Sequence, residues 1–324
     1  MTKDDGKRKG QQPSTIKSVK DEIRQALSGQ EFGSIEAAQA VAGAAAQRVN
    51  RAPLDDFQGL SPDQMQRLIY HPFEADDLVR FGAGIRDRPP ATAALLLELL
   101  AETIDEQGIR LTPKGNLPRK VVAAAVAAID AAGLDREWRV GSVRNEEDLA
   151  ELHIIKLVAE LGRFTRKQKG RLLLTRTTRQ LFAKGDWAAI YPALLYSYCR
   201  EFNWAYRDGL PDLPIIQDAF AFTLYLFHLY GNEWRPITFY QDRFIKAFPA
   251  VLSEVPAEDT RYCPPEEVVR QTWALRTIDR FARFFGLVER VPARKDNQPT
   301  LPWENTDLVR KSPLFDRAVR WRMG

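Results

Sequence analysis

The stretch from Leu161 to Lys184, LGRFTRKQKGRLLLTRTTRQLFAK, constrains the fold more than any other part of the chain. It carries eight Lys and Arg residues and not one Asp or Glu. Gly162 is expected to end a helix, and it is followed by a short strand at Arg163 to Arg166, a Lys-Gln-Lys-Gly turn and a returning strand of alternating leucines. Thr175 can then cap a second helix. The stretch therefore predicts a basic β-hairpin between two helices.

The composition is that of an ordinary folded protein. At 324 residues, with 44% hydrophobic and 28% charged residues, the chain is long enough for two domains or for one domain with additions. The net charge of +4 is small, so the chain outside the basic stretch is slightly acidic. Because local charge density decides what a surface attracts, the clustered positive charge indicates an anionic partner.

Neither the cysteines nor the hydropathy pattern indicates a secreted or membrane protein. Cys199 and Cys263 give no disulfide framework and no metal-ligand spacing, and Cys199 is expected to be a small buried side chain. No N-terminal apolar run resembles a signal peptide, and the most apolar run, Ala219 to Tyr230, is too short to span a membrane. We expect a cytoplasmic protein without membrane association.

The first part of the chain predicts a polar tail and a helical region. Residues 1–15 are polar and basic and are expected to form a disordered tail. Residues 16–90 are expected to form an N-terminal helical region, with helices at Ile16 to Leu27 and Ile35 to Val49. Ser61-Pro62 begins a further helix, because serine can cap a helix whose first turn holds proline.

Residues 91–186 predict the element order of a winged helix-turn-helix. The acidic residues that follow Asn145 would lie at the positive end of a helix dipole. The expected elements are a helix at Thr92 to Ile104, a strand at Ile109 to Leu111, a cap-plus-proline signal at Thr112-Pro113, a helix at Leu117 to Ala132 closed by Gly133, a helix at Asn145 to Leu161, the basic hairpin and a helix from Thr175.

The same order returns in residues 214–324. The expected elements are an aromatic helix at Pro214 to Leu229, a strand at Trp234 to Thr238, helices at Tyr240 to Phe248 and Pro264 to Phe285, a strand at Gly286 to Val291, a polar loop at Pro292 to Asn305, a strand at Leu308 to Lys311 and a helix capped at Ser312-Pro313. Thr112 to Gly162 spans 50 positions and Thr238 to Gly286 spans 48, which indicates an old duplication. We therefore predict a mainly α protein: an N-terminal helical region plus two tandem winged-helix-like modules with short β-hairpin wings, joined by a helical connector at residues 187–213.

Several runs resemble known families. Gly162 to Leu181 resembles the wing of winged-helix DNA-binding domains. The runs LTPKGNLPRKVV (Leu111 to Val122), LLLTRTTRQLF (Leu172 to Phe182) and FQGLSPDQMQRLIYHPF (Phe57 to Phe73) resemble uncharacterised bacterial proteins related to plasmid- and transposon-borne passenger proteins. The resemblance covers Phe57 to Gly324, implies a regulatory or mobile-element setting, and brings no catalytic residues with it. The chain departs from the pattern at Thr178, where glycine is usual.

Low-specificity binding to DNA is the favoured function. The candidate contacts are Arg163, Arg166, Lys167, Lys169, Arg171, Arg176 and Arg179 in the first module, and Arg276, Arg280 and Arg283 in the second. Six to ten contacts with phosphates would make affinity fall by ~10³–10⁵ between low and moderate salt. An equally weighted interpretation is a solvated hairpin whose charges keep an exposed sheet edge from pairing with other chains.

The helix before the wing argues against base reading by the first module. In a winged helix this element usually enters the major groove, yet residues 145–161 carry five acidic residues against Lys156 and too many apolar positions for one exposed face. The three arginines of the second module fall on one helical face, for which a solvated or salt-bridged face is the more frequent explanation. We therefore expect contact with the DNA backbone.

A scaffold and an enzyme are the other functional classes. A protein-interaction scaffold is the alternative, because aromatic residues are dense from Trp187 to Tyr240, although a helical core explains them better than a partner groove. His71, His153 and His228 share no metal-ligand spacing, and no phosphate-binding, dinucleotide-binding or nucleophile-elbow motif occurs. We expect a non-catalytic protein without cofactor or metal; a site of dispersed carboxylates is left open.

Overall fold

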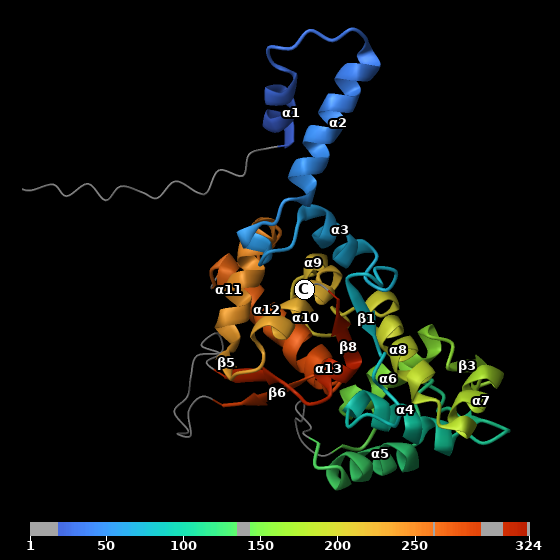
Figure 1. Ribbon diagram of the computed structural model, residues 1–324. Coiled ribbons are helices and arrows are strands. Elements are labelled where there is room, and N and C mark those ends of the chain that lie inside the picture. The colour runs from blue at the N-terminus through green and yellow to red at the C-terminus, as the bar shows by residue number, and fades with distance from the viewer. Residues whose placement is uncertain (1–18, 135–142, 262, 293–306, 323–324) are drawn as a thin grey trace, which may run out of the picture. The chain divides into compact units, whose positions relative to one another are not determined.

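The computed structural model describes residues 19–134, 143–261, 263–292 and 307–322 (Figure 1). The predicted tail and nearly all of the predicted loop at 292–305 lie outside these ranges. The chain divides into two units, one ending at Met65 and the other running from Gln66 to Gly324. Within the described ranges helices dominate and strands form only small antiparallel sheets, which confirms the predicted mainly α fold. No helix in those ranges is long and apolar enough to cross a membrane.

The first unit is a helix pair followed by turns. Its elements are α1 (Val19–Leu27), α2 (Ile35–Arg51), η1 (Asp55–Phe57) and the start of α3 (Pro62–Tyr70). The predicted serine cap of α3 is present: the backbone N of Gln64 donates to the Ser61 hydroxyl at 3.2 Å, and the backbone N of Ser61 donates to the Gln64 side chain at 2.9 Å. This reciprocal capping satisfies two backbone N–H groups that the helix itself leaves without acceptors.

The first module has the predicted order of elements. They are α4 (Thr92–Thr103), β2 (Ile109–Arg110), α5 (Arg119–Ala131), η2 (Glu146–Asp148), α6 (Ala150–Leu161), β3 (Thr165–Gln168), β4 (Arg171–Leu174) and α7 (Arg176–Lys184). The three strands form a sheet of order β2-β4-β3. Thr175 caps α7 as predicted, accepting a hydrogen bond from the backbone N of Thr178 at 3.3 Å.

Two local predictions for this module need correction. Thr112 does not cap α5: its hydroxyl accepts from the backbone N of Asn116 at 3.0 Å, which closes a turn, and α5 starts after Pro118. The helix expected from Asn145 is interrupted, because a 3-10 turn with an Asn145–Asp148 capping box precedes α6. In both places a short polar side chain bonds to nearby backbone and competes with helix formation.

The second module repeats the first. Its elements are α9 (Pro214–Asp218), α10 (Phe220–Tyr230), β5 (Arg235–Pro236), α11 (Ile237–Ala247), η4 (Pro249–Ser253), α12 (Pro265–Trp273), the π-helix η5 (Ala274–Arg283), β6 (Val288–Val291), β7 (Leu308–Lys311) and α13 (Phe315–Ala318). The strand order β5-β7-β6 matches β2-β4-β3 element by element. Figure 1 shows the two sheets on opposite sides of the second unit.

An aromatic core joins the modules, as predicted for the connector. The connector contains α8 (Trp187–Tyr196) and the π-helix η3 (Ser197–Glu201). The buried Tyr191 hydroxyl donates to the backbone O of Phe285 at 2.9 Å, and the buried Trp204 indole donates to the backbone O of Tyr198 at 3.0 Å. Cys199 is buried here, as predicted. These bonds satisfy the polar atoms that large aromatic side chains carry into a core.

A two-stranded sheet ties the start of the second unit to its end. β1 (Val79–Phe81) pairs antiparallel with β8 (Val319–Trp321). Gly82 follows β1 with a φ of 73°, and a Cβ there would lie 2.2 Å from Pro192 of α8. The sequence predicts one N-terminal region at residues 16–90, whereas the structure divides after Met65 and packs β1 within the second unit.

Candidate nucleic-acid interface

The basic stretch forms the predicted hairpin. β3 and β4 are antiparallel, and the last residue of β3 faces the first residue of β4. Lys169 and Gly170 between them have φ values of 49° and 71°, as in the type I′ turns that fit the twist of a hairpin. β3 starts two residues later than predicted, because Arg163 takes a left-handed φ of 57° directly after the helix. Lys169 is therefore exposed at the tip of the wing.

The sheet of the first module has one buried and one outward face. Leu172 of β4 and Thr165 of β3 are buried. Because side chains alternate along a strand, Arg166 of β3 and Arg171 of β4 point to the opposite, outward face. The register sets Arg110 of β2 directly opposite Arg171. Each of the three strands therefore contributes one arginine to the outward face.

Three of the predicted contacts are held by neighbouring groups of the protein. The Lys167 ammonium lies 2.9 Å from a carboxylate oxygen of Glu160. Arg171 donates to the backbone O of Gly108 at 2.8 Å, and Arg179 donates to the backbone O of Asp105 at 2.8 Å. These two arginines hold the turn between α4 and β2 against the sheet, so their first role is structural.

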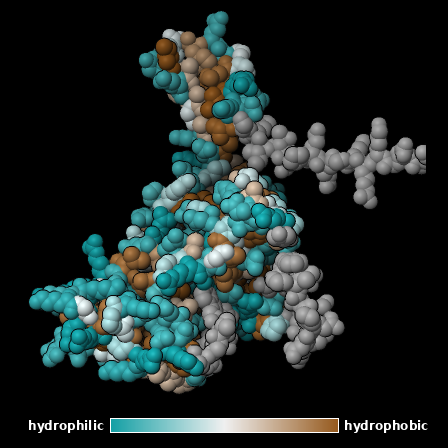
Figure 2. Space-filling view, turned by 180° about the vertical axis from the view of Figure 1, so that it is seen from behind, coloured by the Kyte–Doolittle hydropathy of each residue, from teal (hydrophilic) through white to brown (hydrophobic). Residues whose placement is uncertain are grey.

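Five other cations on or beside the hairpin are exposed and have no carboxylate partner among the described residues. We call this set the basic wing: Arg110, Arg163, Arg166, Lys169 and Arg176. The Arg166 guanidinium is bonded to the neutral side chain of Gln168 at 2.6 Å, which leaves its charge uncompensated. Figure 2 shows a largely hydrophilic surface over the part of the second unit that carries β3 and α7.

The matching sheet of the second module has its cations neutralised. Arg310 of β7 lies 2.7 Å from Glu289 on the paired strand β6. Arg290 of β6 lies 2.7 Å from Asp307, and Arg235 of β5 lies 3.1 Å from Glu233. The two matching sheets therefore differ in charge: cations around the first lack carboxylate partners among the described residues, whereas the cations in the second are paired with carboxylates.

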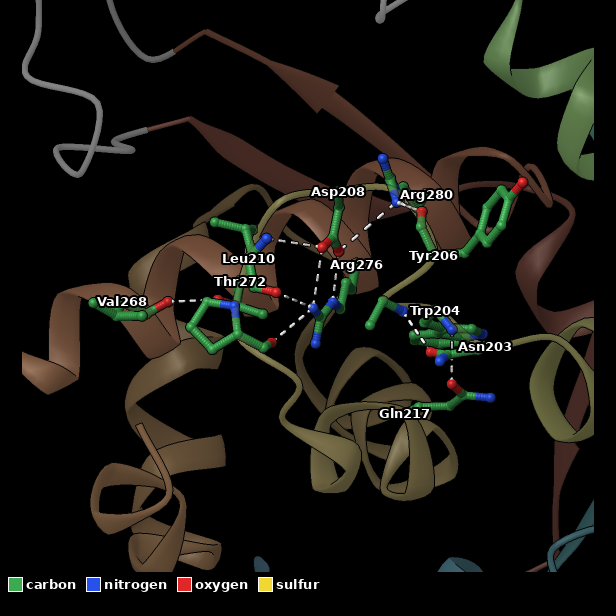
Figure 3. Close-up of polar contacts among 12 residues, drawn as sticks. Asn203, Trp204, Tyr206, Asp208, Leu210, Gln217, Val268, Thr272, Arg276 and Arg280 are labelled. Atoms are coloured by element: carbon green, nitrogen blue, oxygen red, sulfur yellow. Dashed lines mark hydrogen bonds and ion pairs between the residues drawn. The ribbon is translucent and has the colours of Figure 1, made fainter. Parts of the chain in front are cut away.

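Two predicted contacts of the second module are wrong. Arg276 and Arg280 have exposed side-chain fractions of only 2% and 9%. Arg276 donates to the buried carboxylate of Asp208 at 2.8 Å, and Arg280 donates to the backbone O of Tyr206 at 2.9 Å (Figure 3). Arg283 is 16% exposed and lies 3.6 Å from Asp279. The helical face that bears Arg276 and Arg280 packs against the connector, so these two side chains cannot meet a phosphate backbone.

The helix before the first wing is buried on both sides, as predicted. Glu146, just before α6, is fully buried and lies 2.5 Å from the ammonium of Lys156. Burial raises the pKa of Glu146, but hydrogen bonds from His153, Lys156 and the backbone N of Leu117 outweigh it and hold this pKa below its ordinary value. The expectation that Glu146 serves the helix dipole is therefore corrected: its carboxylate is the counterion of a buried lysine.

Residues of α6 and η5 both line a cavity of about 430 Å³. Ile154 and Phe284 line it together with Glu151, Asp279 and other charged residues. Burial raises the pKa of Asp279, although Arg290 beside it acts in the opposite direction. Acidic and basic side chains both line the cavity, which therefore has no evident preference for a ligand of either charge. Among the described residues no group of three or more His, Cys, Asp or Glu side chains is placed to hold a metal ion.

Sequence reasoning missed Arg110 as a surface cation and Asp208 as a buried anion. Arg110 could have been found, because it alternates with Ile109 in a strand that must pair within the predicted sheet. Asp208 lies 68 positions before Arg276, and nothing in the local pattern of either residue indicates the other.

Comparison with known protein families finds a match for the first module. Residues 91–186 match the family model of the Y4jL N-terminal domain. This range coincides with the first winged-helix-like module, including its wing and α7. No curated protein and no solved structure matches the chain. The first module is thus similar to a Y4jL N-terminal domain.

Proposed function

We propose that the protein binds DNA through the basic wing, with contacts to the phosphate backbone and little dependence on sequence. The observation that carries this proposal is the group of exposed cations without carboxylate partners around the sheet of the first module, whereas the cations in the matching sheet of the second module are paired. The sheet of the second module shows that this fold forms with paired cations. Unpaired like charges do not stabilise the sheet of the first module, so we infer that they attract an anion from outside the protein.

Low sequence specificity follows from the buried helix. Base edges are read by elements that enter a groove, whereas phosphate contacts position a protein without reading sequence. α6 buries Leu152, Ile155 and Val158 and is preceded by acidic residues. Because this helix is buried, it cannot enter a groove of the DNA, and the basic wing would contact the phosphate backbone of the DNA instead. Binding of this kind involves no chemical step and requires no cofactor.

The biological setting is proposed on the resemblance of three sequence runs alone. Segments at Phe57 to Phe73, Leu111 to Val122 and Leu172 to Phe182 resemble proteins related to plasmid- and transposon-borne passenger proteins. We therefore place the proposed binding in a regulatory or mobile-element context and in the cytoplasm.

Fluorescence anisotropy of a labelled duplex, titrated at several salt concentrations, tests the proposal. The wild-type log affinity should fall linearly with log salt, with a slope of roughly −0.9 for each phosphate neutralised. Arg166→Glu/Lys169→Glu should abolish measurable binding. Arg48→Glu/Arg51→Glu on α2 is the matched control, because it makes the same change in net charge at exposed residues of the first unit. Equal loss in both variants, or no salt-dependent binding by the wild type, refutes the proposal.

A protein-interaction scaffold is the second candidate, and the outward face of the second sheet favours it. Val291 of β6 is 38% exposed beside the neutral Glu289–Arg310 pair, a mixture typical of protein interfaces. Val291→Glu should release a co-purifying partner and leave the affinity for DNA unchanged. Retention of that partner by Val291→Glu would remove the support for this candidate.

A further inference from the structure

A hydrogen-bonded relay joins a buried carboxylate, a histidine and a tyrosine from three parts of the second unit. The Nδ1 of His153 lies 2.5 Å from Oε1 of Glu146. The Nε2 of the same ring lies 3.0 Å from the hydroxyl of Tyr206. The two rings stack, with centroids 5.8 Å apart and an interplanar angle of 22°. Glu146 is fully buried, His153 is 13% exposed and Tyr206 is half-buried, so the relay runs from the core to the surface.

The surroundings of Glu146 fix the histidine tautomer. Its carboxylate accepts from Lys156 and from the backbone N of Leu117, and these bonds help to hold its pKa low and the group ionised. An ionised carboxylate can only accept hydrogen bonds, so Nδ1 of His153 must carry a proton. When the ring is neutral, Nε2 is then the acceptor and the Tyr206 hydroxyl donates to it. This is the arrangement of an orienting acid, a general base and a nucleophile.

Tyr206 differs in this respect from two buried and two exposed tyrosines of the second unit. Tyr191 and Tyr198 are buried, and their hydroxyls donate to backbone carbonyl groups. Tyr70 and Tyr196 are 59% and 41% exposed, and neither has a histidine against its hydroxyl in the described part of the chain. In Figure 3 the phenol of Tyr206 extends away from the buried arginines, while its backbone carbonyl bonds to one of them.

Positive charge lies beside the relay. The Arg207 guanidinium is exposed and lies 5.4 Å from the centroid of the Tyr206 ring. Lys156, which is bonded to Glu146 of the relay, also donates to the backbone O of Gly115, and exposed Lys114 precedes Gly115 in the chain. Cations at these positions would hold a phosphate near the tyrosine hydroxyl and stabilise charge that develops on its oxygens.

We propose that Tyr206 is a histidine-activated nucleophile that attacks a phosphodiester of bound DNA. As the bond from Tyr206 Oη to phosphorus forms, its proton moves to Nε2 of His153. The bond from phosphorus to the leaving strand oxygen then breaks, and that oxygen takes the proton back from the imidazolium. The product is a phosphotyrosyl-linked strand and a free hydroxyl end, with no oxidant, reductant or added water. The substrate rests on the proposed DNA binding, and the activity replaces the expectation of a non-catalytic protein.

The activation of Tyr206 is tested first without DNA. An arylsulfonyl fluoride should label Tyr206 faster than the more exposed Tyr70 and Tyr196, as followed by peptide mass spectrometry. His153→Asn should slow labelling of Tyr206 by ~10²-fold, the usual effect of losing a general base, and leave the other two rates unchanged in the same sample. Labelling of Tyr206 no faster than that of Tyr196, or insensitive to His153→Asn, overturns the proposal whatever the protein binds.

The transfer step is tested with supercoiled, nicked and single-stranded DNA, each denatured in SDS and analysed for covalent adduct. Wild type should form an adduct that maps to Tyr206. Tyr206→Phe should bind DNA as the wild type does and form none, whereas Arg166→Glu/Lys169→Glu should lose both binding and adduct. Binding without adduct in the wild type overturns the nucleophile and leaves the binding proposal intact. Absence of binding overturns both proposals.

Discussion

Arg110 and Arg171 lie directly opposite each other on the paired strands β2 and β4. Like charges in this position are destabilising in a sheet, by roughly 0.2–1 kcal/mol. The hydrogen bond from Arg171 to the backbone O of Gly108 offsets part of this repulsion. Arg110 is exposed and has no carboxylate partner in the described chain. A neutral residue in place of Arg110 would give a more stable sheet, so the pair raises the positive charge of this surface at a cost in folding stability.

Arg110→Gln should therefore raise the free energy of unfolding and weaken DNA binding at the same time. We expect a gain of roughly 0.2–1 kcal/mol at low salt, shrinking as salt screens the repulsion. Urea unfolding and duplex anisotropy on the same preparation measure the two effects. A variant that loses stability at low salt would show that Arg110 makes a stabilising contact.

Lys156→Met should be strongly destabilising, by about 3–5 kcal/mol, because it leaves the buried Glu146 carboxylate without its main counterion. Adding Glu146→Gln to that variant should recover part of the loss, since no buried charge then remains. Chemical denaturation of the two variants and the wild type gives the comparison. Similar stabilities for the single and the double variant would contradict a charge-based cause.

Stability should fall in acid through Glu146. Its folded pKa is below the ordinary value of about 4.3, so its contribution is complete above that pH and is lost as the pH falls through the lower folded pKa. Urea midpoints measured from about pH 6 downwards should drop for the wild type in this window. Glu146→Gln, which cannot titrate, should give a flatter profile in the same window.

Arg276→Lys should lower stability without changing DNA affinity at temperatures where the variant is folded. Lysine cannot reproduce the two bonds that the guanidinium makes to Asp208 or its bond to the backbone O of Pro211. Thermal unfolding and anisotropy separate these effects. A selective loss of affinity by the folded variant would restore Arg276 as a contact.

Arg163→Gly should stabilise the hairpin by up to about 1 kcal/mol, because the left-handed φ of 57° is costly for any residue with a Cβ. The neighbouring Gly162→Ala should do the opposite, since its Cβ would lie 2.3 Å from the Ser197 hydroxyl oxygen. Denaturant midpoints of both variants test the pair. Equal losses in both variants would mean that the Arg163 side chain itself stabilises the fold.

Structural features that depend on interactions between residues close in sequence could be predicted from the sequence. The alternation of Leu172 and Leu174, the Thr175 cap and the Ser61 cap all depend on neighbours within a few residues, and each appears as expected. The tandem order was predictable for the same reason, because each element carries its own start and stop signals.

Side-chain roles that depend on distant partners were not predictable. Arg276 and Arg280 fall on one helical face, as a nucleic-acid contact would, but Asp208 in the connector draws that face into the core. His153 is bonded to Tyr206, which lies 53 positions away in a loop without a motif, so nothing in the local sequence indicates that pair. Charge patterns identify candidates, and only packing decides which of them reach solvent.

The pairing of β1 with β8 has a consequence for folding. The two strands of this sheet come from residues 79–81 and 319–321, with Trp321 opposite Val79. Contacts of such long sequence separation form slowly, so this sheet is expected to be among the last parts of the second unit to form. Loss of β8 would leave β1 as an open sheet edge, which is prone to pair with other chains.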